Sequence, residues 1–216
     1  MTDMSGLIVL FAGASLLPLM VVTCTAFLKI SVVLLIVRNA LGIQQVPTNM
    51  VVYSITIAAT VFVMAPVFQP LSAWFDGPDF IGQLQNKPNG IMGLINEVIE
   101  PLKAFMLKHT RPNLQEMLLE SATKLWPEEM RQQISKSHWA LILPSFVLSE
   151  LQSAFEIGFL MYLPFVAVDI LVANLLLALG MQMVSPMVVS TPLKLLLFIS
   201  INGWTNLLSR LLLTYQ

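Results

Sequence analysis

Long stretches without a charged residue constrain the fold of this chain more than any other feature of its sequence. Residues 4–28, 39–74, 170–193 and 195–209 contain no Asp, Glu, Lys or Arg. Uncharged apolar runs of about 18 or more residues are typical of helices that cross a membrane. The last stretch reaches that length only if it continues past Arg210, whose long side chain can extend toward a membrane surface. We therefore expect an all-α membrane protein with about four long apolar helices arranged as helical hairpins.

The composition indicates that lipid or other subunits surround the chain. Of its 216 residues, 56% are hydrophobic and 11% are charged, whereas an ordinary soluble domain is about a quarter charged. The net charge is −1 and the basic residues are scattered, so nothing in the sequence favours binding to nucleic acid. Cys24 is the only cysteine, which excludes an internal disulfide and a thiolate metal site.

The middle of the chain differs from the rest and predicts an insertion outside the membrane. Between residues 76 and 137 lie 15 of the 23 Asp, Glu, Lys and Arg residues. Short helices are expected at 93–109, 114–126 and 128–135, and Arg111-Pro112 should end one helix and start the next. The chain is thereby divided into an N-terminal hairpin, a mostly helical insertion and a C-terminal hairpin, at residues 1–75, 76–138 and 139–216.

The flanking charges predict the orientation in the membrane. Lys29, Arg38 and Lys194 flank the short turns between apolar helices. Short cytoplasmic loops are the ones enriched in Lys and Arg. We therefore expect these turns inside the cell, and both termini and the insertion on the opposite side.

Two predicted helices are longer than a membrane is thick. The helical patterns at 6–41 and 139–179 would extend roughly 54 and 60 Å at 1.5 Å per residue, against a hydrocarbon core of about 30 Å. The second is expected to kink at Pro164. Either these helices are spans with interfacial extensions, or they pack against neighbours outside the plane of the bilayer.

Charged residues inside the apolar helices are candidates for pairing, because a charge at membrane depth is costly unless it is paired or faces a polar cavity. An alternative is that helix ends carry these charges to lipid headgroups. The candidates for contacts between helices or subunits are Lys29, Arg38, Glu150, Glu156 and Asp169. Close packing of helices is expected around Ala154, Gly158 and Pro164, since two small residues four positions apart let helices approach.

No catalytic constellation is visible in the sequence. His109 and His138 both lie in the insertion without metal-binding spacing, and there is no nucleophile elbow, phosphate-binding loop or dinucleotide fingerprint. We therefore expect neither enzyme activity nor a metal or cofactor. A different signal is the methionine-rich turn, defined as residues 180–187, which contains Met181, Met183 and Met187. Methionine adapts to irregular surfaces, so such turns repeated around an axis could form an apolar constriction; otherwise these methionines simply pack.

Three blocks of sequence resemble the FliP/SctR family, the export-gate proteins of flagellar and virulence type III secretion systems. The first block is FLKI at 27–30 with VRNALGIQQVPTN at 37–49. The second is LPSFVLSEL at 143–151, AFEIGF at 154–159 and YLPF at 162–165, continuing to Asp169. The third is GMQMVSP at 180–186, TPLKLLLF at 191–198 and GW at 203–204. Together they cover most of the chain outside the insertion.

The resemblance implies a core export-gate subunit. About five copies would form a ring with two other small export-apparatus membrane proteins. This assembly would lie at the base of the secretion apparatus in the bacterial inner membrane, with the insertion on the periplasmic side, and unfolded proteins would cross through it. The virulence-injectisome branch is favoured over the flagellar one, because the chain starts directly at its first apolar segment.

The resemblance also implies a pore gasket at Met181, Gln182 and Met183. Many relatives have an unbroken run of methionines there, which Gln182 and Val184 interrupt in this chain. Where many relatives have a lysine after the Ser-Glu-Leu triplet, this chain has Gln152. From the residues alone, an alternative function is a small ion or solute transporter that uses Glu150, Glu156 and Asp169.

Overall fold

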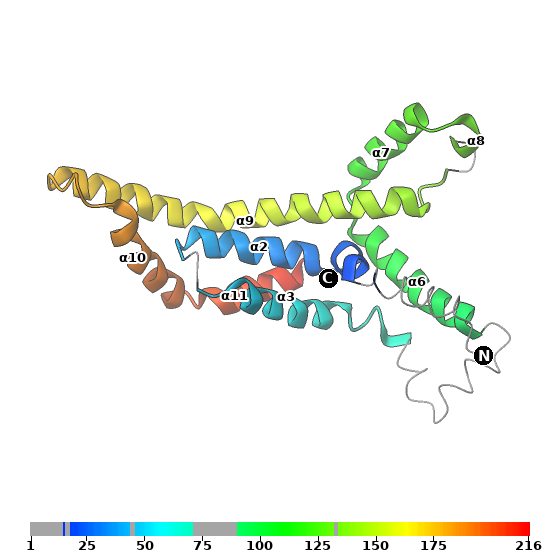
Figure 1. The fold of residues 1–216 in the computed structure, drawn as a ribbon, viewed down its shortest axis with the longest axis horizontal. Coiled ribbons are helices and arrows are strands. Elements are labelled where there is room, and N and C mark those ends of the chain that lie inside the picture. Colours follow the sequence, from blue (N-terminus) through cyan, green and yellow to red (C-terminus); the bar gives the residue numbers. More distant parts are fainter. Residues whose placement is uncertain (1–14, 16–17, 44–45, 71–89, 132–133) are drawn as a thin grey trace, which may run out of the picture. The chain divides into compact units, whose positions relative to one another are not determined.

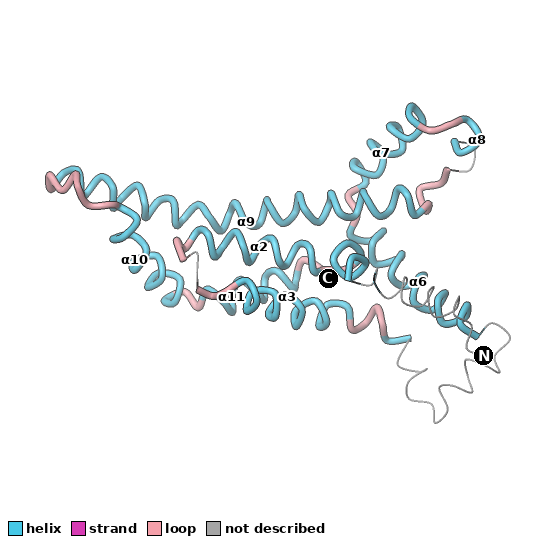
Figure 2. The backbone as a smooth tube through the Cα atoms, viewed as in Figure 1, coloured by secondary structure: helices cyan, strands magenta, loops and turns pink. Residues whose placement is uncertain are grey.

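The described part of the chain is built from helices. The computed structural model describes residues 15, 18–43, 46–70, 90–131 and 134–216. Within these ranges the regular elements are all helices joined by short loops (Figure 1, Figure 2), which confirms the predicted all-α class. Most of the first apolar stretch and the start of the insertion, residues 4–14, 16–17 and 76–89, lie outside the described residues.

The helices belong to two compact units, each described here by itself. The first consists of residues up to 28 and residues 64–150, and the second of residues 29–63 and 151–216. Helix α9 (Trp139–Ala178) contributes to both units, because its residues up to Glu150 belong to the first.

In the first unit the insertion folds into the short helices that the sequence predicts. These are α6 (Gly90–His109), α7 (Pro112–Leu125) and α8 (Glu128–Arg131). Pro112 is the first residue of α7, and Arg111 before it is extended, with φ −71° and ψ 126°. Proline lacks an N–H and disfavours helical geometry in the preceding residue. The boundary predicted at Arg111-Pro112 is therefore confirmed.

The start of α9 packs against the corner between α6 and α7. The rings of Phe105 and Phe146 meet edge to face with centroids 5.9 Å apart. The backbone N–H of Arg111 donates a 2.9 Å hydrogen bond to Ser149 Oγ. Lys136 Nζ lies 3.5 Å from Glu116 Oε1 on the surface. A buried aromatic pair and one hydrogen bond thus attach the insertion helices to α9.

The second unit contains α2 (Phe27–Ala40), α3 (Asn49–Met64), the rest of α9, α10 (Pro186–Ser200) and α11 (Gly203–Leu213). Its core includes fully buried side chains of α2, and the rings of Phe165 on α9 and Phe198 on α10 pack 6.1 Å apart. The core residues of α2 that are at most 1% exposed are Ile30, Val33, Leu34, Val37 and Ala40.

Helix α9 has nearly the predicted bounds, while the other over-long helix is interrupted. The 40 residues of α9 continue through Pro164 without a break and extend about 60 Å. By contrast, helical residues Pro18–Cys24 are separated from α2. The Thr25 hydroxyl donates to Val21 O at 2.5 Å and accepts the N–H of Phe27 at 3.3 Å. Such side-chain bonds compete with the helical backbone ladder, so the continuous helix predicted at 6–41 is wrong.

The last apolar stretch is also broken, into α10 and α11, whose axes differ by 63°. Asn202 between them has a left-handed backbone (φ 51°, ψ 46°), and the ring of Phe198 occupies the space that a side chain at Gly203 would need. By length and composition, α9 can cross a membrane, and each of the two bent pairs can if it forms one span. Helix α3 is apolar as well, but with 16 residues it is shorter than these.

Candidate functional site

The methionine-rich turn connects α9 to α10, and local backbone geometry defines both of its ends. At the end of α9 the N–H of Met181 donates to Leu176 O at 2.9 Å, and the N–H of Gly180 donates to Leu177 O at 3.0 Å. This hydrogen-bond pair, with Gly180 at φ 73°, is a Schellman motif, which requires the left-handed backbone that glycine adopts easily. Pro186 then starts α10 at a position where its missing N–H has no cost.

The methionine and glutamine side chains of the turn are exposed to different degrees. Met183 is fully exposed, and Met181 and Met187 are 45% and 49% exposed. Gln182 is exposed as well. The turn therefore presents flexible thioether side chains and one neutral amide, without a titratable group. It can form an apolar surface against another molecule.

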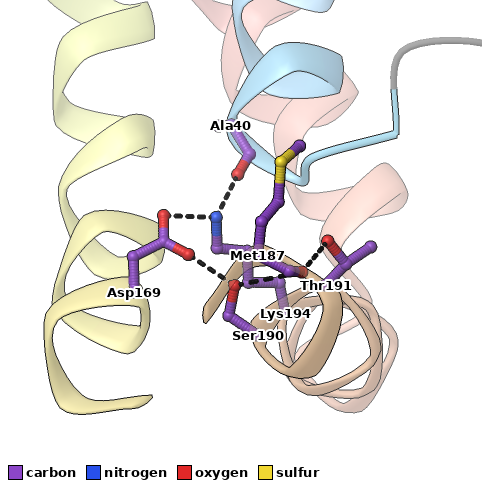
Figure 3. A network of polar contacts seen from close by, with 6 residues as sticks. All are labelled: Ala40, Asp169, Met187, Ser190, Thr191 and Lys194. Carbon is purple, nitrogen blue, oxygen red and sulfur yellow. Dashed lines mark hydrogen bonds and ion pairs between the residues drawn. The ribbon is translucent and has the colours of Figure 1, made fainter. Parts of the chain in front are cut away.

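A buried lysine lies at the base of the turn and joins three helices (Figure 3). Lys194 Nζ on α10 donates to Asp169 Oδ2 on α9 at 2.5 Å and to Ala40 O at the end of α2 at 3.1 Å. Ser190 Oγ donates to the other oxygen of Asp169 at 2.6 Å. We call Ala40, Asp169, Ser190 and Lys194 the Lys194 cluster.

Burial makes the Lys194 cluster strong. The side chains of Lys194 and Asp169 are 5% and 40% exposed, and Ser190 is fully buried. Hydrogen bonds to charged groups are roughly twice as strong as neutral ones. Removing one partner of a fully buried pair typically costs about 3–5 kcal/mol, and the cost here is smaller because Asp169 is 40% exposed and water screens part of the attraction.

The end of α2 also contacts α10 next to the cluster. Gly42 has φ 76°, and a Cβ atom there would lie 2.8 Å from Thr191 Oγ1 and 3.6 Å from Met187 Cε. The hydroxyl of Thr191 in turn donates to Met187 O at 2.8 Å. Glycine at position 42 thus permits a close approach between the end of α2 and the first turns of α10.

An open pocket of about 820 Å³ adjoins the Lys194 cluster. Asp169 and Lys194 form part of its lining, and it extends to the first residues of α10. Other residues that line it are Asn39, Gly42, Tyr162 and Ser185. The pocket accounts for the partial exposure of Asp169.

The other residues predicted for charge pairing have contacts elsewhere. Lys29 Nζ lies 3.4 Å from Thr214 Oγ1 and 3.8 Å from the centre of the Tyr215 ring, near the C-terminus. Arg38 Nη1 donates to Asn49 Oδ1 at 2.5 Å and to Pro47 O at 3.3 Å, within the α2–α3 turn. The contacts of both cations therefore include neutral groups, which a search for charge pairs in the sequence does not predict.

Two acidic candidates and the predicted packing residues lie on α9. Glu150 is 1% exposed, and Glu156 Oε1 accepts a 3.2 Å hydrogen bond from Gln152. Ala154 is fully buried. A Cβ atom at Gly158 would lie 2.5 Å from Ile36 Cδ1, so α2 and α9 approach closely there, whereas Pro164 is exposed in the isolated chain.

Lys194 is the site residue that the sequence analysis missed. It was used there only to predict orientation, although the signal for its pairing was present. Asp169 lies nine residues before the end of α9 (178 − 169), and Lys194 lies eight residues after the start of α10 (194 − 186). In two antiparallel helices joined by a short turn, residues at equal distances from the turn lie side by side.

Known proteins support the resemblance that the motifs indicate. The model of the FliP family matches residues 10–211. Over 208 residues the chain is 50% identical to the harpin secretion protein HrcR of Erwinia amylovora, covering 95% of this chain and 94% of that protein. It is 50% identical over 211 residues to the harpin secretion protein HrpW of Pseudomonas syringae pv. syringae, covering 97% and 100%. With the Yop proteins translocation protein R of Yersinia pestis it shares 38% identity over 216 residues, covering 99% and 97%. The chain therefore belongs to the FliP family of type III secretion export-apparatus proteins.

Proposed function

We propose that this chain is a core export-gate subunit through which unfolded proteins cross the bacterial inner membrane, and that its methionine-rich turn seals the pore. The observation that carries the proposal is an exposed turn of apolar, flexible side chains on a firmly held base. The names of its relatives, which refer to secretion of harpins and translocation of Yop proteins, support assignment to a virulence injectisome.

The surface of α9 supports assembly into an oligomer. In an apolar stretch of 18 residues of α9, only 17% is buried by the rest of the chain. Exposed side chains include Phe155, Phe159, Leu160 and Leu163, which are 47–67% exposed. Because a helix of about 60 Å is twice as long as the hydrocarbon core, lipid alone cannot cover it. About five copies around an axis, with two other small membrane proteins, would bury this surface.

The proposed membrane topology uses the three segments that the sequence predicts. Residues 1–75 and 139–216 form the two hairpins, and residues 76–138 lie on the periplasmic side. The insertion carries charged residues on its surface, among them Glu116, Glu120 and Lys124 on α7 and Lys136 between α8 and α9, which suits an aqueous compartment. The chain acts as a structural part of the channel and performs no covalent chemistry.

The gasket consists of Met181, Gln182 and Met183 from each copy. Apolar side chains that meet around an axis exclude water and therefore ions, while their flexibility lets a polypeptide push them aside. Gln182 of each copy contributes a polar amide group, which makes the constriction less apolar than a ring of methionines alone.

Truncating the gasket tests the proposed function. In the complex with its partner subunits, reconstituted in liposomes, Met181→Ala with Met183→Ala is expected to raise ion leakage several-fold while secretion continues. An ion-sensitive dye measures the leak, and Met117→Ala on α7, where Met117 is also about half exposed, serves as the control. An assembled complex whose leakage stays at the wild-type level would show that the turn is not the seal.

One observation favours a second function, a small ion or solute transporter. The carboxylate of Asp169 is partly exposed in an open pocket, as a cation-binding site requires. Both of its oxygens already accept hydrogen bonds, from Lys194 and Ser190, so a cation would have to displace Lys194. Asp169→Asn separates the two functions, because a transporter would lose ion flux, whereas a gate would show equal or greater leakage.

A further inference from the structure

We propose that Lys194 is a positioning residue for the gate: the Lys194 cluster fixes α10 from Ser190 to Lys194 to α9 and α2, so that only the methionine-rich turn before it moves when a polypeptide passes. The proposal rests on the proposed function, because it assigns a mechanical role to residues beside the gasket. It adds that the end of α2, in the other hairpin, is a working part of the gate.

The residues that hold α10 lie on one helical face. Ser190 and Thr191 lie four and three positions before Lys194, which is the spacing of one side of an α-helix. This face contacts α9 through Asp169 and the end of α2 through Ala40 and Gly42. Two different helices therefore hold the same segment of α10.

Lys194 is suited to this role by its chemistry. An ammonium group has three donors around one atom, and two of them bind acceptors from different helices, Asp169 and Ala40. The bond to Ala40 uses a carbonyl at the end of α2, where the last carbonyls of a helix have no partner within the helix. The carboxylate of Asp169 neutralises the charge, and the carbonyl adds the link to α2.

The turn itself lacks comparable contacts. Its first residues bond to the backbone of α9, and the N–H of Val184 bonds to Met181 O at 3.3 Å. Among the described residues, the side chains of Gln182 and Met183 have no hydrogen-bond partner and are exposed. Segments with few buried contacts open most easily. A firm base and a loosely held tip confine motion to the part that carries the gasket.

Lys194→Met is the direct test, because methionine is also long and unbranched but has no donor. Spin labels are attached in the assembled complex to Val188→Cys, at the base of the turn, or to Met183→Cys, at its tip. Cys24 is 1% exposed and stays unlabelled. Lys194→Met is expected to raise label mobility at Val188 and to increase ion leakage several-fold although Met181 and Met183 are intact. Leu196→Met, which places a methionine on α10 outside the Lys194 cluster at a position that is 66% exposed, is the matched control and should change neither the label mobility nor the leakage.

A double variant separates positioning from charge compensation. If Lys194→Met prevents assembly, Asp169→Leu with Lys194→Met should restore it, because replacing both partners of a buried pair by apolar residues is often neutral. The double variant is nevertheless expected to leak and to keep the mobile label at Val188, since the bond to Ala40 is still missing. A double variant with a tight seal and an immobile label would overturn the proposal.

The experiment also separates this proposal from the gasket. If the variant with Met181→Ala and Met183→Ala does not leak, the proposed function fails. The mobility of the label at Val188 does not depend on leakage, so it still tests the positioning role of Lys194. Unchanged mobility at Val188 in both Lys194 variants would refute the positioning role whether or not the gasket variants leak.

Discussion

Two glycines with nearly the same backbone conformation differ in what surrounds them. Gly42 ends α2 with φ 76°, and Gly180 ends α9 with φ 73°. A Cβ atom at Gly42 would lie 2.8 Å from Thr191 Oγ1, whereas a Cβ at Gly180 has nothing within 4 Å. A left-handed backbone costs a residue other than glycine about 1–2 kcal/mol, so a substitution at either position has this cost. A substitution at Gly42 has a steric cost in addition.

Gly42→Ala is therefore expected to destabilise the protein more than Gly180→Ala. Both variants lose about 1–2 kcal/mol from the backbone, and Gly42→Ala also pushes Thr191 and the first turns of α10 away. Thermal unfolding of the detergent-purified complex, compared with wild type, measures the apparent Tm of each. Equal decreases in Tm would show that the contact between the end of α2 and α10 contributes nothing.

At the scale of single residues, the sequence indicated which side chains make close contacts more readily than it indicated the residues that they contact. Asp169 and Gly158 were singled out, and the structure places the one beside Lys194 and the other against Ile36. The neutral contacts of Lys29 and Arg38 were not predicted, because a search for opposite charges overlooks hydroxyls, aromatic rings and carbonyls. These neutral groups also stabilise a cation.

Helix boundaries could be predicted where proline marks them and not where a polar side chain interrupts an apolar run. The bounds of α7 follow from Pro112, and α9 has close to its predicted bounds. The breaks at Thr25 and Asn202 were missed because both lie in long uncharged stretches, where length suggests one continuous span. The Asn202-Gly203 pair is nevertheless a turn signal, and it should have outweighed the length argument.

The attachment of the insertion to α9 gives a prediction about elements. Ser149 accepts the N–H of Arg111 at the start of α7, while Ser145, one turn earlier on α9, bonds only to carbonyls of its own helix among the contacts seen. Both serines are fully buried. Ser149→Ala leaves the Arg111 N–H without this partner, at a cost of about 1–3 kcal/mol, whereas Ser145→Ala should cost less.

Hydrogen exchange measures this difference at the start of α7. Faster deuterium uptake is expected at residues 111–116 in Ser149→Ala and not in Ser145→Ala. If both variants exchange like wild type, the insertion is held by the Phe105–Phe146 contact and the hydrogen bond is dispensable.

At the scale of the whole molecule, the proposed assembly predicts that folding and assembly are coupled, because the chain leaves a large apolar surface open. Helix α9 exposes Phe159 and Leu160 at 62% and 67%, and Leu196 and Ile199 on α10 are 66% and 71% exposed. Exposed apolar surface of this extent on a membrane protein is covered by lipid or by neighbouring subunits. In the proposed assembly, lipid covers the stretch of α9 within the bilayer, and neighbouring subunits cover the part of α9 that extends beyond it.

Stability that depends on neighbours should therefore depend on protein concentration. A protomer that is completed by other copies gains stability by mass action, so its apparent Tm rises with protein concentration and rises further on co-expression with the partner subunits. Unfolding scans at several concentrations in one detergent, with native mass spectrometry of the same samples, measure the Tm and the number of copies together. Dilution should lower the Tm and the number of copies in parallel. A chain that remains single-copy, with a Tm that is independent of concentration and of the partner subunits, would mean that its own fold compensates the buried charges and that lipid suffices to cover α9.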